Sequence, residues 1–313
     1  MGMLDGKAVV VTGAGRGIGR GVAELAASEG AKVVVNDPGV APDGSGSDKG
    51  PADEVVDAIR SAGGTAVPNY DSVATMQGGE RIIQTCIDSF GRIDCLINVA
   101  GILRDRMFFN MSEEEWDAVI AVHLKGHFAC TKAAIVLMRQ QRYGRIINFA
   151  SQSGLVGNAG QANYGAAKAG VAGFTRVVAR DLGRYGITCN AIAPRALTRM
   201  TGELGGAPAA GALSASIFAE MPPDHIAPMT CFLATDDAWN INGQIFLVYG
   251  GTVNLLAHPT PYRTIFKPGN GLWTLDELSE MVPTLMDDIP NPAPPPEDLE
   301  IPGRSQAQSH AAA

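Results

Sequence analysis

A glycine-rich turn between a strand and a helix near the start of the chain narrows the folds open to this sequence. Residues 7–12 (KAVVVT) form a β-branched run, and residues 20–29 have a helical pattern that ends at Gly30. Glycines allow a tight turn and let the backbone approach a pyrophosphate, which binds at a helix N-terminus. Strand, turn and helix together predict a dinucleotide site. Its candidate cofactor-binding residues are Gly13, Gly15, Arg16, Gly17, Ile18 and Gly19.

An acidic residue follows the second strand, residues 32–36, and bears on the choice of cofactor. Asp37 stands about twenty positions beyond the turn, where a carboxylate can bind the adenosine ribose 2′-hydroxyl. The same charge repels the 2′-phosphate of NADP. Arg16 could favour NADP instead, since its guanidinium could attract that phosphate. The same guanidinium could equally be solvated. The sequence predicts NAD.

Strand-like runs alternate with helical patterns along most of the chain. Further strands are expected at residues 65–69, 95–98, 145–150, 188–192 and 244–248. This alternation predicts an α/β fold, a Rossmann-type doubly wound, seven-stranded parallel sheet with helices on both faces. The helix from residue 116 to about 141 should be irregular around residues 123–126. Residues 38–49 should form a surface loop longer than the usual strand-to-helix connection.

Two further strand ends carry candidate cofactor contacts. Asp71 and Ser72 follow the third strand and could bind the adenine amine, or could instead cap the next helix. Small residues follow the fourth strand, where a backbone must approach a ligand closely. The candidates there are Asn98, Ala100 and Gly101.

Three residues form the candidate catalytic group. Tyr164 and Lys168 stand four residues apart, on one face of a predicted helix. A phenol has a pKa near ~10, and a nearby ammonium should lower the pKa of Tyr164 towards the working range. Ser151 ends the strand at residues 145–150 and can face the same cleft. The spacing alone would also suit an exposed tyrosine and a surface lysine, so the functional interpretation depends on the dinucleotide elements.

Composition excludes several classes of protein. Of 313 residues, 46% are hydrophobic and 18% charged, as in ordinary globular proteins, and the net charge of −8 argues against nucleic-acid binding. The five cysteines lack metal-ligand spacing, so we expect reduced, packed thiols in a cytoplasmic protein and no metal. We expect no signal peptide and no membrane insertion, since we find no uninterrupted apolar stretch of spanning length.

The chain divides into two parts. Residues 1–251 should form the NAD-binding domain, with residues 199–221 either a mobile substrate lid or a plain surface loop. Residues 252–313 should be a C-terminal extension with one short helix at 274–285. The proline-rich tail after that helix is expected to be partly disordered.

The order and spacing of these motifs resemble the short-chain dehydrogenase/reductase family over roughly residues 5–251. A closer likeness is to the branch of (3R)-hydroxyacyl-CoA dehydrogenases that includes multifunctional enzyme type 2 and bacterial hydroxyacyl-CoA and 17-beta-hydroxysteroid dehydrogenases. It rests on residues 35–39 (VNDPG), 69–73 (NYDSV), 101–106 (GILRDR) and 160–164 (GQANY).

The resemblance implies an NAD-dependent enzyme that oxidises a 3-hydroxyacyl-CoA, with a fatty or steroid-derived chain, to the 3-ketoacyl-CoA in β-oxidation. It implies Tyr164 as general base, Ser151 as stabiliser of the oxyanion and Lys168 as a contact to the nicotinamide ribose. It also implies a homodimer or homotetramer. Alternatives are a 17-beta-hydroxysteroid dehydrogenase acting on free steroids, a ketoacyl carrier-protein reductase, or a non-catalytic dinucleotide-binding scaffold.

The sequence departs from the family pattern at two places. His123 stands where the family usually has an asparagine as fourth catalytic residue, so it is either catalytic or structural. Pro194 and Ala196 flank Arg195 where the family commonly has Pro-Gly, and both are candidate contacts to the nicotinamide end of the cofactor.

Overall fold

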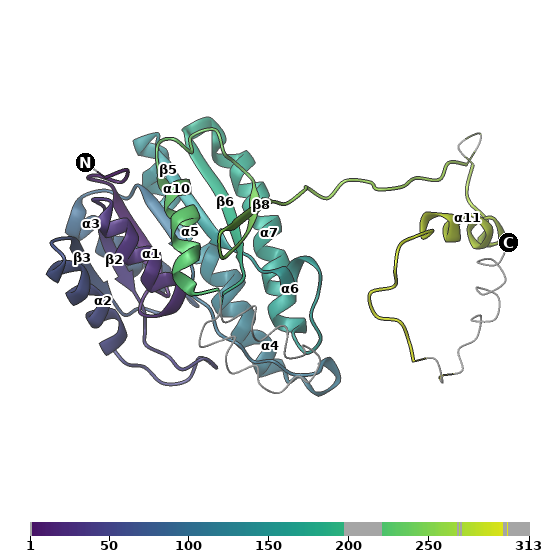
Figure 1. Ribbon diagram of the computed structural model, residues 1–313, viewed down its shortest axis with the longest axis horizontal. Coiled ribbons are helices and arrows are strands. Elements are labelled where there is room, and N and C mark those ends of the chain that lie inside the picture. Colours follow the sequence, from purple (N-terminus) through teal and green to yellow (C-terminus); the bar gives the residue numbers. More distant parts are fainter. Residues whose placement is uncertain (1, 197–220, 268, 270, 297–298, 300–313) are drawn as a thin grey trace. The chain divides into compact units, whose positions relative to one another are not determined.

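A sheet of eight strands runs through the centre of the unit Met1–Ala257 (Figure 1). The computed structural model describes residues 2–196, 221–267, 269, 271–296 and 299. The spatial order of the strands is β3-β2-β1-β4-β5-β6-β7-β8. The strands are β1 (Ala8–Thr12), β2 (Lys32–Asn36), β3 (Thr65–Asn69), β4 (Cys95–Asn98), β5 (Gly144–Phe149), β6 (Ile187–Pro194), β7 (Ile245–Tyr249) and β8 (Thr252–Leu255).

The first seven strands are parallel, as the sequence predicts, because both faces of the sheet are covered. Every residue of β1 and of β5 is buried. The predicted count of seven is wrong, since β8 turns back after Tyr249 and pairs antiparallel with β7. Only four residues long and never fully buried, β8 carries too weak a pattern to be read as a strand from sequence.

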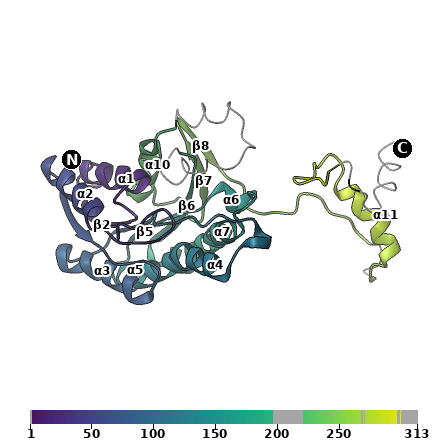
Figure 2. The same cartoon turned by 90° about the horizontal axis from the view of Figure 1, so that it is seen from below.

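Helices cover both faces of the sheet, as Figure 2 shows: α1, α2 and α10 lie on one side and α3, α4, α5 and α7 on the other. Among the described residues of this unit, the α-helices are α1 (Gly17–Ser28), α2 (Gly50–Ser61), α3 (Met76–Phe90), α4 (Glu113–Ile120), α5 (Gly126–Gln141), α6 (Gln152–Leu155), α7 (Ala162–Leu182) and α10 (Ala227–Ala234). Short 3-10 turns lie at Phe108–Asn110, Gly183–Tyr185 and Pro223–Ile226.

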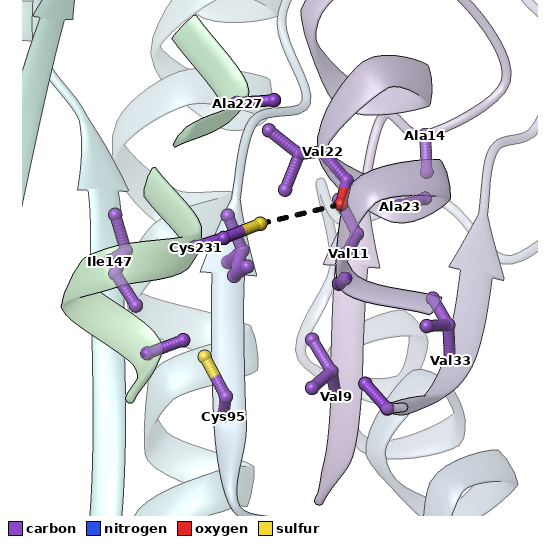
Figure 3. Packing of buried hydrophobic residues seen from close by; sticks show 14 of the residues in the cluster. Val9, Val11, Ala14, Val22, Ala23, Val33, Cys95, Ile147, Ala227 and Cys231 are labelled. Atoms are coloured by element: carbon purple, nitrogen blue, oxygen red, sulfur yellow. Dashed lines mark hydrogen bonds between the residues drawn. The ribbon is translucent and has the colours of Figure 1, made fainter. Parts of the chain in front are cut away.

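The core under α1 and α10 is built from small and β-branched side chains. Figure 3 shows Val9, Val11 and Val22 packed between these helices and the sheet, with Cys231 of α10 donating its thiol to the carbonyl of Val22 at 3.7 Å. Cys95 of β4 lies in the same cluster. All five cysteines are buried and free, so the predicted packed thiols are confirmed.

The stretch between α4 and α5 has the irregularity that the sequence predicts. α4 begins with a capping box between Ser112 and Glu115, and a π-helical turn, Ala121–Lys125, joins it to α5. By length and composition the combined stretch Glu113–Gln141 could cross a membrane, contrary to expectation, although 44% of its most apolar window is buried in the protein. Core helices of soluble proteins share these properties, so the absence of membrane insertion stays a prediction.

The second unit, His258–Ala313, holds the expected short helix, α11 (Leu275–Leu285). Thr274 begins it with a second capping box, in which Thr274 and Glu277 bond each other's backbone N–H groups. The first unit extends to Ala257 rather than to residue 251, because β8 belongs to the sheet. The predicted lid at 199–221 lies outside the described residues apart from Met221. In the predicted tail, residues 297–298 and 300–313 also lie outside them.

Candidate active site

A cavity of about 720 Å³ opens at the carboxyl ends of the parallel strands. Its walls include the ends of β1 and β4, where the strand order reverses and open α/β sheets bind their ligands. Most of the predicted site residues line it. They are Gly13, Arg16, Gly17, Ile18, Gly19, Asp37, Ser72, Ala100, Gly101, His123, Ser151, Tyr164, Lys168, Pro194 and Ala196.

The glycine turn leaves no room for side chains at two positions. Gly13 has φ of +67°, and a Cβ added to it would lie 2.7 Å from the Ala100 Cα. A Cβ on Gly19 would lie 2.1 Å from the Gly13 carbonyl oxygen. Helix α1 begins at Gly17, and the Arg16 side chain does not cap it. The close backbone approach and this uncapped helix start fit the phosphates of a dinucleotide.

Asp37 is held in place beside the turn. Its carboxylate accepts the Gly15 N–H at 2.9 Å and the Gly39 N–H at 2.7 Å. A carboxylate fixed at the end of β2, at the cavity wall, fits the ribose hydroxyls of an adenosine. Gly15 itself does not line the cavity, although its N–H bonds Asp37.

Two other predicted contacts lie outside the cavity lining. Asp71 forms an ion pair with Arg81 at 2.6 Å, and the cap of α3 is Thr75 rather than Asp71 or Ser72. The Asn98 side chain is buried inside the sheet, where it donates to the Asn148 side chain at 3.0 Å. Cofactor binding by Asp71 and Asn98 stays a prediction that their side-chain positions do not favour.

Ser151, Tyr164 and Lys168 come together from β5 and α7, because the end of β5 lies beside the start of α7. The Lys168 ammonium is 5.7 Å from the centre of the Tyr164 ring, and it donates to the Phe149 carbonyl at 2.5 Å. The Ser151 hydroxyl accepts the Ser153 N–H at 3.2 Å, which begins α6. All three residues line the cavity.

Burial governs the protonation of this group. It lowers the pKa of the Lys168 ammonium from its ordinary 10.5 to about 7. Burial also raises the pKa of Tyr164 above its ordinary 10.0. The Ser151 side chain lowers this pKa, but by less than burial raises it. The negative charge of Asp105 adds to the rise. The prediction that the pKa of Tyr164 lies below its ordinary value is wrong for the protein alone, because desolvation of the phenolate and the charge of Asp105 raise it.

His123 sits in the π-helical turn and contacts the chain that follows β4. Its Nε2 lies 2.8 Å from the carbonyl oxygen and 3.1 Å from the backbone nitrogen of Ile102. Its ring meets the Tyr164 ring edge-on at 5.1 Å between centres. Burial, with a smaller effect of Lys168, holds the pKa of His123 well below its usual value, so the ring is neutral. These contacts favour the structural alternative, and a catalytic role stays a prediction.

Sequence reasoning missed one wall of the cavity. The first part of the loop at residues 38–49 lines the cavity, through Pro38, Val40, Ala41, Pro42 and Gly44. Two hydrogen bonds hold it there: the Leu103 N–H donates to the Pro42 carbonyl at 2.9 Å, and the Arg104 guanidinium donates to the Asp43 carbonyl at 2.8 Å. Gln161, just before Tyr164, also lines the cavity. The unusual length of the loop was the available signal. Among the described residues, no group of three or more His, Cys, Asp or Glu could hold a metal ion.

Comparisons with known proteins agree with this site. The family model described as short chain dehydrogenase matches residues 7–207. Hydroxyacyl-CoA dehydrogenase ChsB1 of Mycobacterium tuberculosis is 42% identical over 284 residues, 88% of this chain and 87% of that protein. Peroxisomal multifunctional enzyme type 2 of Drosophila melanogaster is 49% identical over 229 residues, 73% of this chain and 36% of that enzyme. A short chain dehydrogenase from Mycobacterium avium superposes with a TM-score of 0.79 at 42% identity, covering 94% of this chain and 99% of that one.

The chain belongs to the short-chain dehydrogenase family and is an oxidoreductase that acts on alcohol groups. The family typically binds a nicotinamide dinucleotide. The chain spans most of the Mycobacterium tuberculosis relative but only about a third of the multifunctional enzyme, 36% of its length.

Proposed function

We propose that this protein oxidises a 3-hydroxyacyl-CoA, with a fatty or steroid-derived chain, to the 3-ketoacyl-CoA with NAD as hydride acceptor. The observation that carries the proposal is one cavity lined by the glycine turn, Asp37 and the group of Ser151, Tyr164 and Lys168. A dinucleotide scaffold without catalysis would not need the last three. The printed names of two relatives, a hydroxyacyl-CoA dehydrogenase and a multifunctional enzyme, support the substrate class.

Each side chain has a role that its position supports. The Tyr164 hydroxyl, as phenolate, takes the proton of the substrate hydroxyl. The Ser151 hydroxyl, which lines the same cavity as Tyr164, stabilises the developing alkoxide. Lys168 holds the dinucleotide by its ribose hydroxyls and favours the tyrosinate by its charge when protonated. A bound nicotinamide dinucleotide supplies the hydride acceptor.

The preference for NAD rests on Asp37. Two backbone N–H groups fix its carboxylate at the cavity wall, so a 2′-phosphate brought to the same place would meet a negative charge. Arg16 also borders the cavity and is the residue that would favour NADP. NAD use in turn supports oxidation over the biosynthetic reduction of a ketoacyl carrier protein.

The assay that tests the proposal follows formation of the reduced cofactor by absorbance, with NAD and, separately, with NADP. The substrates are a medium-chain (3R)-hydroxyacyl-CoA, a steroid side-chain hydroxyacyl-CoA and a free 17-beta-hydroxysteroid. Turnover of a thioester far above the free steroid supports the proposal. Turnover of the free steroid alone would make the protein a hydroxysteroid dehydrogenase, and equal efficiency with NADP would refute the role of Asp37.

The role of Tyr164 has its own prediction. Tyr164→Phe should bind the dinucleotide with unchanged affinity and lose turnover by about 10²- to 10⁴-fold, the usual contribution of a general base. Tyr143 offers a matched control, because its hydroxyl bonds Asp236 at 2.8 Å and it does not line the cavity. Tyr143→Phe should keep its turnover. A Tyr164→Phe variant with near-normal turnover would exclude the tyrosine as base.

We also propose that the protein is a cytoplasmic homodimer or homotetramer that binds no nucleic acid and does not insert into a membrane. Exposed apolar side chains on α5 and α7 support self-association: Phe128, Val136 and Val177 are 43%, 55% and 58% exposed. The net charge of −8 supports the absence of nucleic-acid binding. Light scattering behind a sizing column measures the assembly, and a monomer at micromolar concentration would contradict it.

A further inference from the structure

Asn163 is a fully buried polar residue whose place the chemistry above does not explain. It lies in the first turn of α7, directly before Tyr164, with 0% of its surface exposed. It does not line the cavity, so it has no direct contact with a ligand there. A buried amide costs stability unless all its donors and acceptors are satisfied. Its partners therefore indicate what it is there for.

The Asn163 side chain bonds three backbone groups from three parts of the chain. Its Nδ2 donates to the Arg104 carbonyl at 2.9 Å and to the Glu115 carbonyl at 3.0 Å. Its Oδ1 accepts the Tyr164 N–H at 2.7 Å. Both amide hydrogens and the oxygen are thus used, and they join α7 to the chain after β4 and to α4.

The two carbonyls belong to segments that are already linked to each other. Arg106 forms an ion pair with Glu115 at 2.9 Å, and Glu115 completes the capping box that begins α4. In the segment that follows β4, two residues before Arg104, the backbone N–H and carbonyl of Ile102 both contact the His123 ring. The Asn163 amide therefore joins the start of α7 to two segments that also bond to each other.

Tyr164 is the residue whose position depends on this junction. Its ring meets the His123 ring edge-on at 5.1 Å between centres, and its hydroxyl has to work beside Ser151, which follows β5 and lines the same cavity. A shift of the first turn of α7 would move the hydroxyl away from Ser151 while leaving the glycine turn and Asp37 in place. Loss of the Asn163 amide would then impair proton transfer at Tyr164 while leaving dinucleotide binding at the glycine turn and Asp37 unchanged.

We propose that Asn163 is a positioning residue, which sets the place of the Tyr164 hydroxyl by joining the start of α7 to residues 104 and 115. The inference rests on the proposed function in one respect, that Tyr164 is the general base. It adds that the base is held through the backbone by the neighbouring buried amide rather than by contacts of its own ring alone.

The test compares Asn163→Ala and Asn163→Ser with Asn190→Ala in the full chain. Asn190 is the matched control: it is 1% exposed, donates to the Ile241 carbonyl at 2.7 Å and accepts the Gln244 N–H at 3.0 Å, away from the cavity. For each variant, kcat, KM, the Kd for NAD, the pH profile of kcat/KM and the thermal midpoint are measured. The substrate is whichever secondary alcohol the unaltered protein oxidises fastest.

We expect Asn163→Ala to lower kcat by about 10- to 100-fold, the effect of misplacing a reacting group by roughly 1 Å. The Kd for NAD should change less than about threefold, since a threefold change is under about 0.7 kcal/mol. The pH limb reporting Tyr164 should move upward, because the Ser151 hydrogen bond that lowers the pKa of Tyr164 is weakened. Asn163→Ser keeps an acceptor and one donor and should recover part of kcat. Asn190→Ala should lose thermal stability and keep kcat.

Three results would overturn the proposal: normal kcat with an unmoved pH limb in a folded Asn163 variant, an equal fall of kcat in Asn190→Ala, or a parallel loss of NAD binding. Asn163→Ser carries the test if Asn163→Ala does not fold. A protein that oxidises another secondary alcohol but no thioester refutes the proposed substrate and leaves Asn163 testable on that alcohol. A protein that oxidises no alcohol removes Tyr164 as base, and the proposal with it.

Discussion

Gly19→Ala should weaken dinucleotide binding through one added methyl group. The new Cβ would lie 2.1 Å from the carbonyl oxygen and 2.8 Å from the carbonyl carbon of Gly13. The obstacle is backbone inside the turn, and Gly13 is itself packed closely against the Ala100 backbone, so the turn cannot move away freely. Overpacking of this kind costs about 1–3 kcal/mol. If the turn shifts to relieve it, the phosphate site opens and the Kd for NAD should rise about 10- to 100-fold, at 1.4 kcal/mol per factor of ten.

Calorimetric titration with NAD and thermal unfolding measure the two parts of this effect. For a unit of this size, 1–3 kcal/mol corresponds to a fall in the thermal midpoint of roughly 2–12 °C. Gly173→Ala is the matched control, because it lies inside α7 and its added Cβ would meet nothing within 4 Å. Alanine there should stabilise the helix by about 0.5–1 kcal/mol and leave NAD binding unchanged. Unchanged affinity and midpoint in Gly19→Ala would refute the reasoning from close approach.

Two further predictions follow from buried ionisable groups. Because burial lowers the pKa of Lys168 from 10.5 to about 7, the unfolded chain binds more protons between these values, and stability should rise with pH there. The free energy of unfolding, measured with a chemical denaturant from about pH 7 to 9, should rise less with pH in Lys168→Met than in the unaltered protein. An identical slope against pH in the two proteins would contradict the buried ammonium. His123, whose pKa burial holds well below 6.5, should stay neutral from about pH 5 to 8 in ring NMR spectra assigned with His123→Asn. A titration midpoint near 6.5 would show that the ring is solvated.

Local pattern was enough to predict most of the architecture. Alternating apolar runs and helical periods predicted the seven parallel strands within a residue or two, since each element carries its own period. The glycines at 13 and 19 and the spacing of Tyr164 and Lys168 likewise act over short distances. The irregular helix around His123 was also predicted.

Prediction from sequence failed where the outcome depends on packing between distant segments. The short strand β8 forms because it has β7 to pair with, and its own four residues predict little. Asp71 is engaged by Arg81, and His123 by the Ile102 backbone, through contacts that no local pattern encodes. Residues 38–49 could be predicted as a loop, but not as a wall of the cavity.

The sequence by itself determined which chemical groups this protein has and the order of the elements that carry them, because backbone preference and side-chain period are local. Only the tertiary structure decided the state of those groups. Desolvation, which lowers the pKa of Lys168 and raises that of Tyr164, depends on everything packed around a side chain. Two of the three hydrogen bonds of Asn163 depend on segments 48 and 59 residues away. Such contacts exist only after the chain has folded.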